Sequence, residues 1–364
     1  MNLKTKLDLA HGRPSGFDYM RLILSIGVIG IHSALTSYGT DAQMWMSWTR
    51  PFVRLILPMF FALSGYLVAG SLLRSKSLFQ FLTFRVLRIY PALSVEVLLS
   101  AFIVGPLLTH ASLQSYFGDR QFWQYLLNVT GDIHYLLPGL FLDNPFPRTV
   151  NAQLWTVPFE LLCYVTIAGL AVIGLKWRRW LGPLSVVVLT AGYTVIKVRH
   201  FHGAPPVIIG SVSGMFMLVS FLAGMSLFLY SDRVKWSRGL CVASGLLSGL
   251  LLSVVPNGDY IVAPFAAYFT VSLGLMNPRK LAILRGADYS YGIFLYGFVI
   301  QQVLMDVLPA ARVWWLNLVL SVLLATAVAA LSWHYIEKPA LRLKRYIPDH
   351  LRFRGWLAGR TTMG

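Results

Sequence analysis

An arginine and a histidine stand inside the first long apolar run of this 364-residue chain. Arg21 and His32 lie eleven positions apart, and the residues between them are almost all Leu, Ile, Gly and Val. On a helix this spacing puts His32 roughly 16 Å farther along the axis, about three turns on and on nearly the same face. Ionisable side chains at membrane depth are costly and usually functional, so His32 is a candidate general base. The alternative is that His32 only hydrogen-bonds a neighbouring helix.

A carboxylate follows at a comparable depth in a later apolar run. Glu160 closes the segment Leu154–Glu160, about two turns from the start of that run. If Glu160 accepts a proton from one ring nitrogen of His32, it fixes the tautomer and leaves the other nitrogen free to activate a hydroxyl. The alternative is that Glu160 is neutral, or that it bonds a backbone group freed by Pro158.

Two arginines three positions apart offer an anion site. Arg85 and Arg88 are neighbours on one helical face, and paired guanidinium groups match phosphate oxygens. The run before them ends in Phe60–Tyr66, where small residues permit close helix approach and Tyr66 offers a hydroxyl. The alternative is that both arginines are ordinary basic anchors at a membrane surface.

Three more acids lie in or beside apolar runs. We expect Asp288 to cap the helix that follows it and Glu337 to form a salt bridge. Glu96 lies about two turns deeper than Arg88, and we expect it to pair with an arginine rather than to act in chemistry.

Ten apolar runs of about the 20 residues that a bilayer core requires would position these groups. They are Phe17–Ser37, Phe52–Leu73, Leu87–Leu108, Leu154–Leu175, Leu181–Ile196, Val207–Tyr230, Leu240–Val255, Tyr260–Leu275, Tyr289–Val307 and Trp314–Tyr335. The first run follows basic residues as a signal peptide would, but it lacks a clear cleavage site, so we interpret it as a retained span. The sequence therefore predicts an all-α membrane protein, a polytopic bundle of about ten transmembrane helices.

Charge and composition support this prediction. The chain is 56% hydrophobic and only 12% charged, which excludes an ordinary soluble domain. With both termini placed in the cytoplasm, 24 of the 31 Lys and Arg residues fall on the cytoplasmic side, as the positive-inside rule requires. The net charge of +17 is thus a topology signal, and no nucleic-acid partner is needed. We expect a transmembrane domain over residues 1–337 and a basic cytoplasmic tail over residues 338–364.

The connections and the missing motifs narrow the function. On the far side, loops Tyr38–Pro51 and Thr109–Gln153 are long enough to cover a site. Cys163 and Cys241 lie inside apolar runs and are expected in the core. There is no Walker A loop, no Cys or His metal pattern and no Gly-x-Ser-x-Gly elbow, so we expect neither a metal site nor phosphoryl transfer.

Six motifs carry a resemblance to a known family. In chain order they are Asp18 to Arg21 with Arg21-x10-His32; Phe60 to Tyr66, which contains Ser64-Gly65-Tyr66; Arg85-x2-Arg88 followed by Ile89-Tyr90-Pro91; Leu154 to Glu160; Asp288-Tyr289-Ser290-Tyr291-Gly292; and Tyr335-Ile336-Glu337-Lys338-Pro339. The chain resembles the bacterial acyltransferase-3 family of integral membrane enzymes, which move acyl groups, usually acetyl, from the cytoplasm onto extracytoplasmic glycans. The resemblance implies an inner-membrane location.

The resemblance also implies roles for the candidate residues. His32 would be the catalytic base, and Glu160 a supporting acid. The donor site would comprise Arg21, Arg85 and Arg88, to which we add Ser64 and Tyr66. No cofactor would be bound, since acetyl-CoA or another acyl-CoA is a co-substrate.

The expected reaction is O-acetylation of a hydroxyl on an extracytoplasmic or lipid-linked polysaccharide. Its partners would be acyl-CoA, the glycan acceptor and the lipid bilayer. Direct transfer is preferred, although Ser33 beside His32 keeps an acyl-enzyme open. The alternatives are an acyltransferase acting on a lipid or small molecule, and a transporter or flippase of a lipid-linked sugar. The absence of an inverted repeat counts against a transporter.

Overall fold

The computed structural model describes residues 1–39, 50–201, 212–254, 259–281 and 286–346. These parts of the chain are helical, and their only β pairing is two isolated bridges. The apolar helices are α2 (Gly16–Tyr38), α4 (Arg50–Arg74), α5 (Leu78–Leu99), α9 (Val157–Ile173), α10 (Leu181–Phe201), α11 (Gly214–Leu229), α12 (Arg238–Val254), α13 (Asp259–Gly274), α14 (Ser290–Val307) and α15 (Trp314–Ser332). Shorter helices are α1 (Leu3–Leu9), α6 (Gly105–Leu108), α7 (Leu113–Gly118), α8 (Arg120–Leu126) and α16 (Lys338–Arg342).

Each of the ten predicted apolar runs coincides with an apolar helix. In the described residues, six helical stretches are long and apolar enough to cross a membrane, and α10 to α13 supply four shorter apolar helices. The prediction of an all-α membrane bundle is therefore confirmed, and the protein is a multi-pass membrane protein. The first residues of the sixth predicted run, 207–211, lie outside the described residues.

The third span begins earlier than predicted. The side chain of Ser77 caps it by accepting a hydrogen bond from the backbone N–H of Gln80 at 3.1 Å, so α5 starts at Leu78 rather than at Leu87. Arg85 and Arg88 consequently lie inside the helix, about two to three turns from its start. Arg85 and Arg88 interrupt the apolar character of the first turns of α5, so hydropathy alone does not predict them as part of the span.

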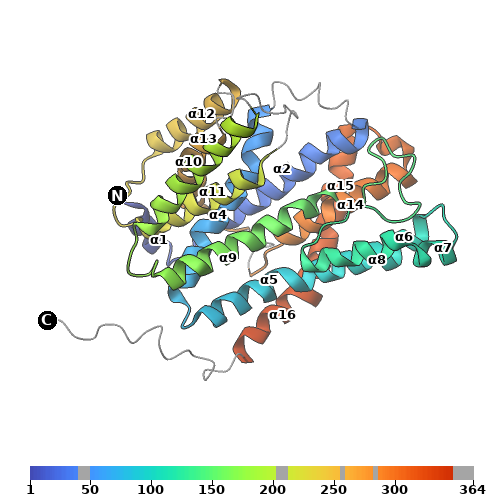
Figure 1. The fold of residues 1–364 in the computed structure, drawn as a ribbon, viewed down its shortest axis with the longest axis horizontal. Coiled ribbons are helices and arrows are strands. Elements are labelled where there is room, and N and C mark those ends of the chain that lie inside the picture. Colours follow the sequence, from blue (N-terminus) through green and yellow to red (C-terminus); the bar gives the residue numbers. More distant parts are fainter. Residues whose placement is uncertain (40–49, 202–211, 255–258, 282–285, 347–364) are drawn as a thin grey trace.

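Helix α4 is at the centre of the bundle and packs along α11, with α2 and α13 also against it. At Gly65 an added Cβ would meet the backbone of Phe221, and at Gly224 it would meet the backbone of Ala62. Glycine therefore allows the backbones of α4 and α11 to approach closely at two points, as expected for small residues in membrane helices. In Figure 1, α10, α12 and α13 lie on one side of this core, and α5, α8 and α16 lie on the other.

Within the described ranges, two helices contain a π-helical turn, a feature that is frequent at functional sites. Helix α5 continues through the π-helical residues Ser100–Val104 into α6. Helix α15 continues through the π-helical residues Trp333–Glu337 into α16, which packs against α5. Residues 338–346 of the predicted tail are thus helical, whereas residues 347–364 lie outside the described part of the chain.

The long connection between α6 and α9 is held onto α14. The side-chain amide of Gln302 donates to the carbonyl oxygens of Phe146 at 2.8 Å and Thr149 at 2.6 Å. Asn151 donates to the carbonyl oxygen of Leu295 at 2.9 Å. These buried bonds fix residues 144–151 over one end of the bundle. Most of the other predicted covering loop, residues 40–49, lies outside the described residues.

The expectation for Glu96 is wrong. Its buried carboxylate accepts hydrogen bonds from Ser100 and Asn151, both at 2.9 Å, and it forms no ion pair within the described chain. Asn151 belongs to the long connection between α6 and α9, which folds back onto α5 and reaches Glu96. No arginine of the described chain reaches this carboxylate. Both cysteines are buried and free, as predicted.

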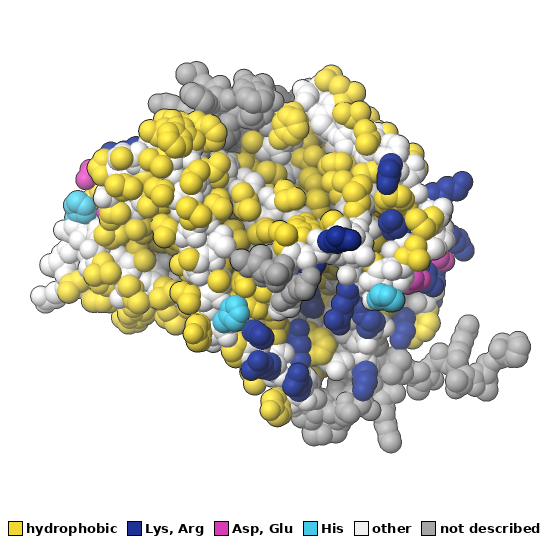
Figure 2. All heavy atoms as spheres, turned by 180° about the vertical axis from the view of Figure 1, so that it is seen from behind, with side chains coloured by type: hydrophobic (Ala, Val, Ile, Leu, Met, Phe, Trp, Pro, Cys, Tyr) yellow, Lys and Arg dark blue, Asp and Glu magenta, His cyan; other side chains and the backbone are white. Residues whose placement is uncertain are grey.

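The surface has the character of a membrane protein. On the face drawn in Figure 2, hydrophobic side chains cover most of the surface, and Lys and Arg side chains gather toward one end. Helices α9, α10 and α12 expose large apolar residues such as Val172, Val187 and Leu246. We call the end of the bundle that holds Arg21, Arg88 and Lys344 the basic end.

Candidate functional site

A cavity at the basic end collects most of the predicted site residues. We call it the arginine cavity, and its wall includes Arg21, Ser64, Arg85, Arg88 and Glu160. These residues come from α2, α4, α5 and α9, so four helices that are distant in sequence position one group of polar side chains. Apart from Thr156 and Ser290, the remaining wall is mostly apolar and aromatic, which is typical of a pocket in which a few polar groups orient a ligand.

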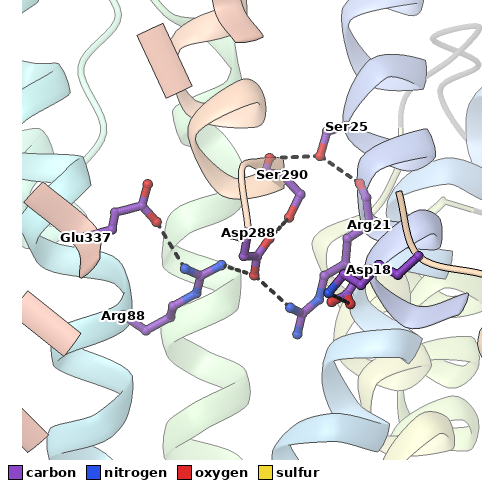
Figure 3. Close-up of polar contacts among 8 residues, drawn as sticks. Asp18, Arg21, Ser25, Arg88, Asp288, Ser290 and Glu337 are labelled. Atoms are coloured by element: carbon purple, nitrogen blue, oxygen red, sulfur yellow. Dashed lines mark hydrogen bonds and ion pairs between the residues drawn. The ribbon is translucent and has the colours of Figure 1, made fainter. Parts of the chain in front are cut away.

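One carboxylate links two of the arginines. Oδ2 of Asp288 lies 2.8 Å from Nη1 of Arg21 and 2.7 Å from Nη2 of Arg88. Nη1 of Arg88 also lies 3.0 Å from Oε2 of Glu337, whose side chain is 2% exposed. Figure 3 shows Asp288 between the two guanidinium groups, with Glu337 on the far side of Arg88. The chain of charges ties α2, α5, α14 and the end of α15 together.

Asp288 is expected to be the N-cap of α14, but it is not. The residue preceding that helix is Tyr289, and Oδ1 of Asp288 accepts instead from the hydroxyl of Ser290 at 2.5 Å. Asp288 lies in the connection before α14, outside the spans. Its burial would raise the pKa, but the charges of Arg88 and Arg21 and the hydrogen bonds of Ser290 hold that pKa well below its ordinary value. Asp288 is therefore ionised at physiological pH. Glu337 forms a salt bridge, as predicted.

Arg85 differs from the other two arginines because it forms no ion pair in the described part of the chain. Its Nη2 donates to Oγ of Ser71 at 3.3 Å, its Nε has no partner, and its guanidinium lies 5.9 Å from the ring centre of Tyr164. Lys344 lies near the same region, with its ammonium 5.1 Å from the ring centre of Phe84. Sequence reasoning missed Lys344, because nothing in the basic tail distinguished it from its neighbours.

A second cavity contains His32. We call it the histidine cavity, and its wall is mostly apolar and aromatic, with His32, Gln153 and Thr156 as polar groups. Its residues are Val28, Ile31, His32, Val53, Leu57, Tyr135, Gln153, Trp155, Thr156, Val212 and Phe294. Three of them, Leu57, Thr156 and Phe294, also line the arginine cavity. The two cavities are therefore neighbours that share a wall.

The expected pair of His32 and Glu160 is not formed. Glu160 accepts a hydrogen bond from the hydroxyl of Tyr164 at 2.6 Å and belongs to the arginine cavity. The polar neighbour of His32 is Gln153, whose side-chain amide lies 3.5 Å from Nδ1. The physical reason is that Gln153, in the 3-10 turn Ala152–Thr156 that precedes α9, lies at the level of His32, so Glu160, seven residues on, lies about two turns farther along the axis.

Two further candidates, Tyr66 and Ser33, do not line either cavity. Ser64 lines the arginine cavity, but Tyr66 is two positions on, so it faces the other side of α4. There it packs against Phe17 and Phe228, and its hydroxyl has no hydrogen-bond partner in the described chain. Tyr66, predicted for the donor site, therefore does not line the arginine cavity.

Ser33 is also occupied elsewhere. Its hydroxyl donates to the carbonyl oxygen of Ile29 at 2.9 Å and accepts from the side chain of Gln301 at 2.8 Å. It is fully buried and does not line the histidine cavity. This geometry favours direct transfer over an acyl-enzyme on Ser33.

No group of three or more potential metal ligands occurs in the parts of the chain that the structure describes. His32 lies in a cavity that adjoins a second cavity with a strong cationic character, and this arrangement can support acid–base chemistry.

The chain is similar in sequence to known acyltransferases. A family model described as an acyltransferase domain, Acyl_transf_3, matches residues 15–334. An O-acetyl transferase of Shigella phage Sf6 is 25% identical over 329 residues, covering 88% of this chain and 94% of the relative. Nodulation protein 10 of Rhizobium leguminosarum bv. viciae is 28% identical over 371 residues, covering 92% of this chain and 95% of the relative. No solved structure matches.

Proposed function

The chain belongs to the acyltransferase-3 family and is an O-acyltransferase, and we propose that it moves an acetyl group from cytoplasmic acetyl-CoA to a hydroxyl of an extracytoplasmic or lipid-linked polysaccharide. The acetyl group is supported by the name of the phage relative, an O-acetyl transferase. The proposed location is a bacterial inner membrane, with both termini in the cytoplasm.

A single structural observation carries the proposal. The arginine cavity and the histidine cavity share Leu57, Thr156 and Phe294, so a cationic chamber adjoins a chamber with a candidate base. A donor with an anionic head and a thin reactive arm fits this order. Its phosphates would lie at the basic end, and its thioester would reach past the shared residues toward His32.

The anionic head would be attracted by Arg85, which lines the cavity, and by Lys344, which lies near Arg85 and Arg88. Arg21 and Arg88 are already neutralised by Asp288 and Glu337, whereas Arg85 and Lys344 form no ion pair in the described chain. Cations without an ion-pair partner in or beside a cavity attract an anionic ligand and bind phosphate oxygens with charge-assisted hydrogen bonds. Arg21 and Arg88 would then hold the shape of the cavity, and Ser64 would line the path of the donor arm.

The reaction needs one proton acceptor. His32 removes the proton from the acceptor hydroxyl as its oxygen attacks the thioester carbonyl. The new C–O bond forms, and the tetrahedral intermediate collapses with cleavage of the C–S bond. The sulfur leaves with the electron pair, and protonated His32 returns the proton to it. Glu160 is too far into the arginine cavity to share this step directly, and its bond to Tyr164 instead shapes the wall beside Arg85.

The acceptor would enter the histidine cavity from the side of the long connection. Tyr135 and Trp155 present aromatic surface there, against which the apolar face of a sugar ring packs. A hydroxyl of that ring would then point at His32. A lipid or small-molecule acceptor is the alternative, and transfer assays with purified protein separate a lipid from a glycan.

The experiment has two parts. In cells, His32→Ala at wild-type protein level should remove O-acetyl groups from surface glycan, and unchanged acetylation would reject His32 as the base. In detergent, the purified protein should transfer label from acetyl-CoA to glycan and not to extracted lipid. Transfer to lipid alone would replace the proposed acceptor, and no transfer from acetyl-CoA would replace the proposed donor.

A further inference from the structure

The side chain of Gln153 lies between His32 and the backbone of α14. It is 1% exposed and belongs to the 3-10 turn that precedes α9. Its main chain is fixed on both sides: its N–H donates to Oδ1 of Asn151 at 3.2 Å, and its carbonyl oxygen accepts from the hydroxyl of Thr156 at 3.1 Å. Gln153 therefore presents its amide to His32 from a rigid support.

The backbone of α14 decides how this amide is oriented. Only one orientation satisfies both amide atoms: the nitrogen donates to the carbonyl oxygen of Phe294, and the oxygen accepts from the N–H of Phe298 at 3.0 Å. In that orientation the atom 3.5 Å from Nδ1 of His32 is the amide oxygen. An amide oxygen has two lone pairs, so it can accept from both Phe298 and His32.

An acceptor opposite Nδ1 selects one form of the imidazole. The proton must reside on Nδ1, where it is donated to Gln153, and Nε2 is left with a free lone pair. The opposite orientation would place the proton on Nε2 and remove the basic site. The 3.5 Å separation is at the long end of hydrogen-bond range, which is common for catalytic contacts in the absence of substrate.

The ring of His32 is also held in direction. It lies edge-on to the ring of Phe298, with 5.1 Å between ring centres and an angle of 84° between the planes. The backbone N–H of Phe298 holds the Gln153 oxygen, so one residue of α14 sets both the position of the imidazole and the orientation of the amide.

We propose that Gln153 is a positioning residue that accepts the Nδ1 proton of His32, fixes the tautomer with Nε2 unprotonated, and thereby makes His32 a competent base. The inference depends on the proposed role of His32 as that base. When His32 takes the proton of the acceptor at Nε2, the bond from Nδ1 to Gln153 is kept and becomes charge-assisted, so the same contact stabilises the imidazolium.

The test uses side chains of similar length. Gln153→Met keeps the length and removes the acceptor, whereas Gln153→Glu keeps an acceptor oxygen toward Nδ1. For Gln153→Met we expect kcat to fall about 10- to 100-fold, at most the lower end of the ~10²–10⁴-fold that general base catalysis supplies, with an unchanged KM for acetyl-CoA. Gln153→Glu keeps the acceptor toward Nδ1 but loses the donor to the carbonyl oxygen of Phe294, so it should recover part of kcat. The acid limb of its kcat profile should move to higher pH because a carboxylate stabilises the imidazolium.

A spectroscopic readout separates positioning from packing. In protein labelled with ¹⁵N-histidine, the His32 signals, assigned by their loss in His32→Ala, should show the Nδ1–H form in wild type and a tautomer mixture in Gln153→Met. The control is Gln301→Met, because Gln301 is a buried amide of α14 that bonds α2 without touching His32. That variant should keep the wild-type tautomer.

Failures of the inference and of the proposed function are distinguishable. If His32→Ala retains activity, the base assignment itself is rejected. If His32→Ala is inactive but Gln153→Met has wild-type kcat and tautomer, only the role of Gln153 is overturned. If Gln153→Met does not accumulate, the pH profile of Gln153→Glu decides, since an unmoved acid limb contradicts a contact with His32.

Discussion

The guanidinium of Arg88 and the carboxylate of Asp288 meet at 2.7 Å although 200 residues separate them in the chain. Through this contact the Arg-x2-Arg stretch of α5 is joined to the entrance of α14, and through Asp288 it is joined to Arg21 of α2. The pair shows that not all cations of the arginine cavity have the same task. Under the proposed function, Arg21 and Arg88, which have carboxylate partners, would maintain the architecture, and Arg85, which forms no ion pair in the described chain, would be available to the donor.

Asp288→Asn tests the architectural task. The change keeps the shape but removes the charge that Arg21 and Arg88 share, so we expect a loss of roughly 2–3 kcal/mol of stability. This is below the ~3–5 kcal/mol for breaking a fully buried pair, because the Asp288 side chain is 20% exposed. Thermal midpoints in detergent would measure it. Asp232→Asn is the control, since its exposed pair with Arg179 should contribute nothing measurable, and equal shifts would contradict the assignment.

The direction of the Asp288 pKa shift determines how its contribution to stability depends on pH. The pKa of Asp288 is depressed despite its burial, because Arg88 and Arg21 favour the ionised form. The contribution is therefore complete above the unfolded value of about 3.9 and is lost only as the pH falls through the lower folded-state value. The midpoint difference between wild type and Asp288→Asn should be constant between about pH 5 and 8. A difference that shrinks within that range would count against this ion-pair cluster.

Arg85→Gln and Arg88→Gln should have different consequences. Removing the charge of Arg85 should raise KM for acetyl-CoA about tenfold or more with little change in thermal midpoint, because a charged hydrogen bond contributes about 1.5–3 kcal/mol. Arg88→Gln leaves the buried Glu337 without its ion-pair partner, so it should lower the midpoint. Initial rates over a range of acetyl-CoA concentrations, with midpoints of the same preparations, would reveal the contrast. Identical behaviour of the two variants would refute the division of tasks.

Gly65→Ala should destabilise the contact between α4 and α11. The added Cβ would enter the backbone of Phe221, and overpacking of this kind costs about 1–3 kcal/mol. Gly249→Ala is the matched control, because it lies in α12 with open space around the new Cβ and should be neutral or stabilising. Midpoints that fall equally in both variants would show that the close approach is not what requires glycine at position 65.

Ser33→Ala should leave kcat close to wild type. The hydroxyl is bonded to Ile29 and Gln301 and does not line the histidine cavity, so its loss removes hydrogen bonds worth about 1 kcal/mol and no nucleophile. Steady-state rates and a search for labelled acetyl-enzyme by intact-mass measurement would test this. Loss of activity in a stably folded variant would revive the acyl-enzyme route.

The sequence by itself determined the spans. The length of an apolar run and its bounding charges are local properties, so all ten runs were predictable. The spacing of Arg85 and Arg88 was equally local, and it placed both on one helical face. The start of α5 at Leu78 could not be predicted from hydropathy alone, because a capping serine and two arginines are also typical of a loop.

Tertiary structure decided which side chains meet. Depth along a span could be estimated for His32 and Glu160, but the facing direction depends on how α9 is rotated and on the 3-10 turn that starts it. Those features place Glu160 beside Tyr164 and give His32 an amide neighbour, Gln153, instead. The partners of Arg88 likewise come from segments 200 and 249 residues away, and only the packing of α5 against α14 and the end of α15 brings their charges together.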